Sequence, residues 1–172
     1  MKKTLWLLAC LGIISACYYQ RKLVEPVFQN SFSCKINGVD WKPEGGTNAA
    51  GGIKIPTIDV GKYVFNAISI DALKNIRDEK TGKSIIFEGI NFTVNLELDT
   101  KTIINRSSFY QYGENNNGCS DYYSDSIATN IAKVIALDTS QKMVRGIFEF
   151  EARSPSCGKT VKVTEGKFEL KY

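Results

Sequence analysis

The sequence predicts an all-β fold, either an antiparallel sandwich or a partly closed barrel of about 8–10 short strands with at most one short helix. The clearest signal lies in Ile90–Leu98, where apolar and polar residues alternate over nine residues, the period of a strand with one buried face. Similar apolar runs recur along the chain, and turn residues such as Asn37-Gly38 separate them roughly every ten residues. The sequence shows no internal repeat, so a single domain over residues 31–172 is expected.

The individual elements follow from local patterns. Asn37-Gly38 is a strong hairpin turn, and Asp71 is a candidate helix N-cap before Leu73 and Ile76, although this segment could form only a turn. The expected elements are a hairpin over 31–41, a flexible glycine-rich loop over 44–52, a strand over 62–70, a short helix over 71–80, a strand over 85–98, a strand over 102–112, a polar loop over 113–126, strands over 131–137 and 143–152 around a turn at 138–142, a strand over 159–163, a turn at 164–166 and a closing strand over 168–172.

The alternation also predicts which side chains form the core. In residues 143–152 two phenylalanines share one face, whereas Glu149 and Glu151 share the other. The large side chains expected to point inward are Phe92, Leu96, Phe148, Phe150 and Phe168.

Residues 1–16 have the features of a secretory signal peptide. Lys2 and Lys3 precede an apolar run, Leu5–Ile14, that is too short to cross a bilayer, for which roughly 20 residues are needed. The run ends in Ile14-Ser15-Ala16-Cys17, which resembles the lipobox of bacterial lipoproteins. This resemblance implies lipidation at Cys17, a tether over residues 17–30 and anchoring to the membrane through the lipid. A secreted protein without lipid and a buried N-terminal element are the alternatives.

Charge and composition exclude several classes of function. The chain has 22 Lys and Arg against 18 Asp and Glu, and loss of Lys2 and Lys3 with the signal lowers its net charge from +4 to +2. No dense basic cluster remains, so a nucleic-acid partner is not expected. The chain has no histidine, which excludes Ser-His-Asp and Cys-His catalysis and imidazole-ligated zinc. We therefore expect no catalytic residue, metal or cofactor.

The cysteines indicate one disulfide. Of the five, Cys10 leaves with the signal and Cys17 would carry the lipid, so three remain in an oxidising compartment. Cys34 alternates with apolar neighbours and is expected to lie in the core. Cys119 and Cys157 lie in turn-like segments and are the natural pair, with two free surface thiols as the alternative.

A candidate ligand-binding loop lies between residues 110 and 123. Aromatic rings beside amides and carboxylates can stack on and hydrogen-bond a sugar or a peptide. The alternative is that about half of these rings pack inward at strand ends. The residues expected to form this site are Tyr110, Tyr112, Asp121, Tyr122 and Tyr123.

Two other chemistries are less favoured. An EF-hand centred on Gly118 would place Gly113 and Ser124 at two acidic ligand positions, so this spacing fails. Glu149 and Glu151 share a strand face, but their Lys and Arg neighbours indicate a solvated surface rather than a hydrolytic pair.

Two stretches together resemble a known group of proteins. One is Phe32–Trp41, directly after the tether, and the other is the strand meander from Ile127 to Tyr172. The combination is similar to small uncharacterised lipoproteins of the Bacteroidota, families with a domain of unknown function, and it covers most of residues 31–172. This resemblance implies an all-β fold and an outer-membrane location, but no reaction. Some lipoproteins of this group carry an acidic export signal after the lipidated cysteine, and here no acid precedes Glu25, which favours the periplasmic face over the cell surface.

The expected function is therefore that of a non-enzymatic, membrane-anchored lipoprotein of the bacterial cell envelope. It would act as a binding or accessory module with a glycan or protein partner. The alternative is a lipocalin-like carrier with an internal apolar cavity, which requires a closed barrel with a void. The predicted set of large inward side chains favours a filled core instead.

Overall fold

The computed structural model describes residues 30–45, 47–48, 54–55, 57–63, 66–77, 80–81, 84–104, 107–112, 119–124 and 130–172. The predicted signal peptide, Cys17 and all but the last residue of the tether lie outside these residues. The described residues contain no helix, and therefore none long and apolar enough to span a membrane.

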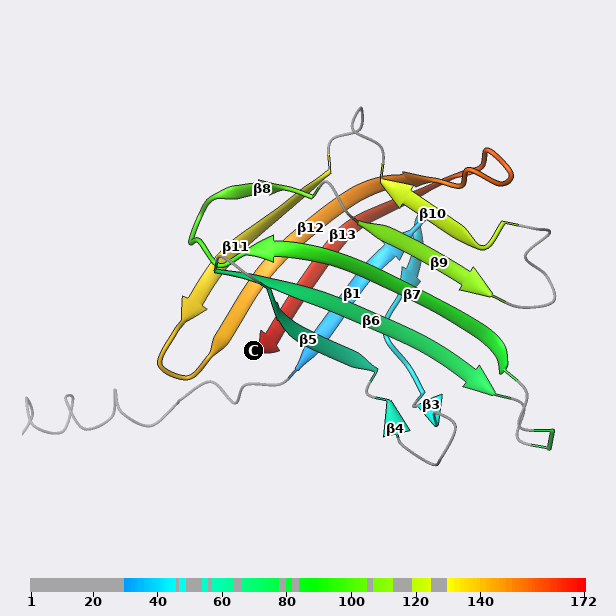
Figure 1. The fold of residues 1–172 in the computed structure, drawn as a ribbon, viewed down its shortest axis with the longest axis horizontal. Helices are drawn as coiled ribbons and strands as arrows, with labels where there is room; N and C mark the ends of the chain where they lie inside the picture. The colour runs from blue at the N-terminus through cyan, green and yellow to red at the C-terminus, as the bar shows by residue number, and fades with distance from the viewer. Residues whose placement is uncertain are drawn as a thin grey trace, which may run out of the picture.

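Every described element of regular structure is a β-strand, which confirms the all-β class (Figure 1). The strands are β1 (Ser31–Ile36), β2 (Val39–Trp41), β3 (Thr47–Asn48), β4 (Lys54–Ile55), β5 (Ile58–Tyr63), β6 (Ala67–Arg77), β7 (Ser84–Asn95), β8 (Lys101–Ile103), β9 (Ser108–Tyr112), β10 (Asp121–Ser124), β11 (Ile131–Asp138), β12 (Met143–Arg153) and β13 (Thr160–Lys171).

The strands form a sandwich of two layers. The first layer contains β2, β1, β13 and β12, and β11 and β8 extend it beyond β12; the second contains β5, β6, β7, β9 and β10. In Figure 1 the strands β5, β6 and β7 cross in front of β12, β13 and β1. One edge of β12 pairs with β11 and then, at its C-terminal end, with β10, so the layers are continuous at this corner. The path of paired strands ends at β2 and β5 and does not close into a barrel.

Aromatic rings fill the space between the two layers. The ring centroids of Phe92 and Phe148 are 4.6 Å apart, and those of Phe32 and Phe148 are 4.9 Å apart. Phe168 packs against the same two rings, at 6.0 Å from Phe92 and 6.3 Å from Phe148. The five side chains predicted to point inward are all buried: Phe92, Leu96, Phe148, Phe150 and Phe168.

The first hairpin and the meander over residues 131–153 form as predicted. Asn37 and Gly38 have φ angles of 51° and 84°, the left-handed values that a type I′ turn requires at both positions. The Asn37 side chain also accepts a hydrogen bond from the Lys162 amide at 2.9 Å, which ties this turn to β13. In the turn between β11 and β12, Asp138 Oδ1 accepts bonds from the amides of Ser140 and Gln141.

The predicted helix over 71–80 is wrong, because residues 67–77 form strand β6. This strand pairs with β7 along its whole length and with β5 over its first half. Its alternating burial places Ile68, Ile70 and Ala72 in the core, and this tertiary pairing overrides the local helix-start signal at Asp71. The single strand expected over 62–70 is also wrong, since the chain reverses between β5 and β6, with Asn66 at a φ of 57°.

Three further expectations need correction. The predicted turn at 164–166 is a bulge inside the continuous strand β13, and a Cβ at Gly166 would overlap Phe148, so the glycine permits close packing. Residues 102–112 divide into β8 and β9. Within the predicted loop 44–52, Glu44 pairs with β6 and β3 pairs with β4.

Candidate functional site

One outer face of the sandwich collects most of the predicted site residues. On β9 and β10, Tyr110, Tyr112, Asp121 and Tyr123 point away from the core, because alternate residues of a strand face opposite sides. The register of β7 and β6 adds Phe87 and Asp71 to this surface. We call these residues the tyrosine face: Asp71, Phe87, Tyr110, Tyr112, Asp121 and Tyr123.

The prediction that Tyr122 belongs to this site is wrong. Residues 121–124 form strand β10 rather than part of a loop, so Tyr122 points inward while its neighbours point outward. The Tyr122 side chain is 5% exposed, and its ring lies 5.6 Å from that of Phe109 in the core. Residues 113–118 of the predicted loop lie outside the described residues.

The Tyr110 side chain extends from β9 across β7 to β6, beneath the exposed part of the tyrosine face. It pairs with Gly89 in the register of β7 and β9, and a Cβ at position 89 would overlap its ring, so glycine is what lets the ring lie flat on β7. Its hydroxyl donates a hydrogen bond to Asp71 Oδ1 on β6 at 3.1 Å. Burial and the neighbouring Asp71 carboxylate both raise the pKa of Tyr110, so its phenol remains a donor at neutral pH.

Asp121 is held in a defined orientation by two hydroxyl donors. Tyr112 donates to Asp121 Oδ1 at 2.8 Å, and Ser120 donates to Oδ2 at 2.8 Å. The bond to Asp121 also raises the pKa of Tyr112, because the carboxylate favours the protonated phenol. A fixed carboxylate oxygen therefore lies beside an exposed aromatic ring.

Aromatic packing supports the exposed rings. The centroids of Phe87, Tyr110 and Tyr112 are 5.9 to 6.1 Å apart, so each ring contacts the other two. Tyr112 is 46% exposed and Tyr123 is 56% exposed. Tyr112 and Tyr123 are thus the contact surface, and Phe87 and Tyr110 form its base.

A disulfide anchors strand β10, which carries Asp121 and Tyr123 of the tyrosine face. Cys119, just before β10, is joined to Cys157 in the turn between β12 and β13, the pairing expected from sequence, with a Cα–Cα distance of 5.6 Å. β10 pairs with β12 at only two residues, Tyr123 and Ser124, so the disulfide adds a second link to the first layer. Cys34 is free and buried, and burial raises the pKa of its thiol to about 12, which keeps it protonated and unreactive.

The outer face of the other layer has a different character. Cross-strand ion pairs cover it, including Arg145 with Glu169 at 2.8 Å and Lys162 with Glu151 at 3.4 Å. Lys35 and Glu165 add a third pair at 2.7 Å. We call this surface the charged face; exposed pairs of this kind are typical of a solvated surface.

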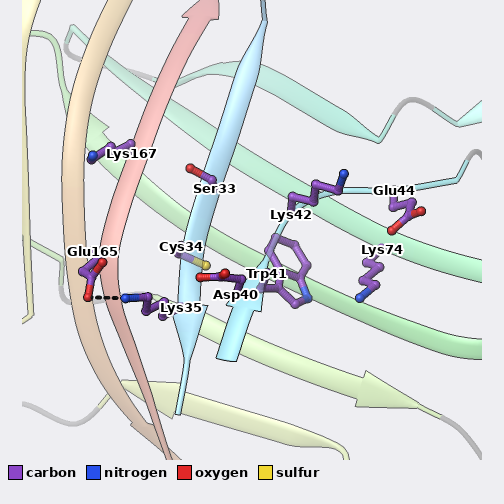
Figure 2. A pocket seen from close by; sticks show the side chains of 10 residues that line it. All are labelled: Ser33, Cys34, Lys35, Asp40, Trp41, Lys42, Glu44, Lys74, Glu165 and Lys167. Atoms are coloured by element: carbon purple, nitrogen blue, oxygen red, sulfur yellow. Dashed lines mark hydrogen bonds and ion pairs between the residues drawn. The ribbon is translucent and has the colours of Figure 1, made fainter. Parts of the chain in front are cut away.

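A cleft of about 340 Å³ opens where β2 ends and the chain crosses from the first layer to β6 (Figure 2). Trp41 lies at this opening, and its indole nitrogen donates to Glu88 Oε2 at 2.8 Å. Gln111 donates to the other Glu88 oxygen at 3.0 Å, so these groups close one end of the sandwich. The lining mixes both charges: Ser33, Cys34, Lys35, Asp40, Trp41, Lys42, Glu44, Lys74, Glu165 and Lys167.

Sequence reasoning missed the cleft and part of the tyrosine face for the same reason. The cleft is assembled from β1, β2, β6 and β13, which are far apart in sequence. Asp71, Phe87 and Gly89 reach Tyr110 only through strand pairing, although the alternation in β7 could have placed the last two on its outer side.

No family model, curated protein or solved structure matches the chain, so the tyrosine face is interpreted from its own chemistry. Among the described residues, no three acidic, cysteine or histidine side chains gather closely enough to hold a metal ion.

Proposed function

We propose that the protein is a non-enzymatic, membrane-anchored lipoprotein of the bacterial envelope whose β domain binds a glycan on the tyrosine face. One observation carries this proposal. Two exposed tyrosines, Tyr112 and Tyr123, lie on a rigid sheet beside Asp121, whose carboxylate is held by two hydroxyl donors.

The chemistry of these groups matches that of a sugar ring. A tyrosine ring offers an apolar surface to the C–H groups of a sugar, and its hydroxyl can exchange hydrogen bonds with the sugar hydroxyls. The oriented Asp121 carboxylate can accept bonds from sugar hydroxyls with its remaining lone pairs. Because these side chains stand on paired strands, little conformational entropy is lost when the ligand binds.

The anchoring half of the proposal rests on the N-terminal sequence. The lipobox-like Ile14–Cys17 supports lipidation, and the periplasmic side of the outer membrane is the favoured location. The described chain begins at Asn30, whose side chain accepts a hydrogen bond from the Lys171 amide at 3.1 Å, beside the C-terminus. In Figure 1 the C-terminus lies at the lower left of the strands, whereas β9 and β10 lie to its upper right. The anchor would therefore leave the tyrosine face free to meet a ligand.

The packing of the interior gives less support to the alternative of a lipocalin-like carrier. A carrier needs an internal void, whereas Phe32, Phe92, Phe148 and Phe168 occupy the space between the layers. The described clefts open at the surface rather than among these rings.

A glycan array tests the proposal. The detergent-solubilised lipoprotein should bind a defined set of glycans, and Tyr112→Ala and Tyr123→Ala should each weaken that binding by about 30-fold, since buried aromatic contacts at interfaces contribute about 2 kcal/mol or more. Glu151→Gln, on the charged face, is the matched control and should bind as the wild type does. Equal binding by all three variants would contradict the assignment of the tyrosine face, and binding only to a protein partner would redirect the proposal to protein recognition.

A further inference from the structure

The acidic residues of the tyrosine-bearing layer form a row across the sheet. Asp59 on β5 lies directly opposite Asp71 on β6, Asp71 accepts a bond from Tyr110, and Tyr110 lies opposite Asp121 on β10. The row therefore runs from the sheet edge to the exposed tyrosines.

These carboxylates lack cationic partners among the described residues. None of Asp59, Asp71 and Asp121 forms an ion pair there, and like charges directly opposite each other on a sheet are destabilising. Burial is the main cause that raises the pKa of Asp71, and the Asp59 charge acts in the same direction.

The charged face shows that carboxylates without cationic partners are not a general property of the fold. There, Glu169 is paired with Arg145 across strands, and Glu151 with Lys162. One surface of the same sandwich thus pairs Glu151, Glu165 and Glu169 with cations. On the other surface Arg153 of β12 lies opposite Tyr123, but none of the three aspartates forms an ion pair with it.

We propose that the tyrosine face selects neutral glycan chains and rejects glycans that carry uronic acid or sulfate groups, an inference that rests on the glycan-binding function proposed above. Hydroxyl groups can donate to the row of carboxylates, but an anionic group in the same position is repelled. In water, two like charges at 4 Å oppose each other by about 1 kcal/mol, which is about fivefold in affinity for each carboxylate. Specificity of this kind depends on a repulsive element as well as on attractive contacts.

The experiment compares neutral and acidic glycans on the same array with the detergent-solubilised lipoprotein. We expect the bound glycans to be neutral, and acidic derivatives of the same backbone to bind at least about tenfold more weakly at low salt. Raising the salt concentration should leave binding of the neutral glycan unchanged and improve binding of its acidic derivative, because salt screens repulsion.

Matched variants separate charge from shape. The double variant Asp59→Asn with Asp121→Asn removes two charges, and an asparagine at 121 keeps an oxygen that can accept the Tyr112 hydroxyl bond. At about fivefold for each carboxylate, this double variant should reduce the preference for neutral over acidic glycans by up to about 25-fold, whereas Glu151→Gln should leave the preference unchanged. Tighter binding of acidic glycans, weakened by salt, would overturn the inference while leaving glycan binding intact. No binding to any glycan would instead overturn the proposed function and the inference with it.

Discussion

Tyr122 and Tyr123 are adjacent in β10 and should respond to truncation in opposite ways. Tyr122 is buried against Phe109, so Tyr122→Ala removes a core ring and an aromatic pair. Truncation of a large buried aromatic side chain costs about 3–5 kcal/mol. For a domain of this size, the melting temperature should fall by about 10 °C. Tyr123 is 56% exposed, so Tyr123→Ala should change stability by no more than about 0.5 kcal/mol.

The measurement is a thermal melt of both variants, with glycan binding measured on each at a temperature where it is folded. We expect Tyr122→Ala to lose stability and Tyr123→Ala to lose affinity with an unchanged melting curve. Equal destabilisation by both substitutions would show that Tyr123 is packed, and would remove the argument that the tyrosine face is a free contact surface.

Four further predictions address the anchor, the disulfide and the base of the tyrosine face. Cys17→Ser should abolish incorporation of a palmitate analogue, and labelling that survives this substitution would contradict lipidation there. Titration of the denatured, unreduced mature protein should find one free thiol, Cys34, whereas three would contradict the pairing in the structure. Gly89→Ala should displace the Tyr110 ring and weaken glycan binding by about tenfold. Its effect on the melting curve should be smaller, because the atoms that the new Cβ would overlap are at the end of the Tyr110 side chain. Unchanged binding would show that Tyr110 does not support the site. Because the fold raises the pKa of Asp71, ionisation of this carboxyl opposes folding. The stability of Asp71→Asn relative to the wild type should therefore increase as pH rises from about 3 to about 7, measured by urea unfolding at each pH. A stability difference that does not vary with pH would contradict this reasoning.

Local pattern predicted the parts of the fold that depend on alternation and turn chemistry. The strand over residues 90–95, the turn at Asn37-Gly38 and the hairpin formed by residues 131–153 all follow from rules that span a few residues. The Cys119–Cys157 pairing followed from elimination among the cysteines, without knowledge of the fold.

The errors arise where distant pairing decides the structure. Residues 71–77 carry a helix-start signal, but pairing with β7 along this whole segment, and with β5 at Asp71 and Ala72, places them in a strand. The polar segment around Tyr122 predicts an exposed loop, and only its pairing with Phe109 in the register of β9 and β10 reveals that the side chain points inward.

The candidate site was predicted only in part, because the pairing of distant strands assembles its base. Tyr110, Tyr112, Asp121 and Tyr123 are close in sequence, so composition alone brought them to notice. Their base was not predictable in this way, because Asp71 belongs to a strand about 40 residues earlier and reaches the site by sheet register.

A glycan that binds at the tyrosine face should perturb that face and leave the rest of the domain unchanged. The most direct measurement is residue-resolved NMR chemical-shift mapping of the lipoprotein, titrated with the tightest-binding glycan from the array. We expect the largest shifts at Tyr112, Asp121 and Tyr123, with no change along the charged face. Shifts centred on the cleft around Trp41 and Lys74 would contradict it and assign binding to the opening between the two layers.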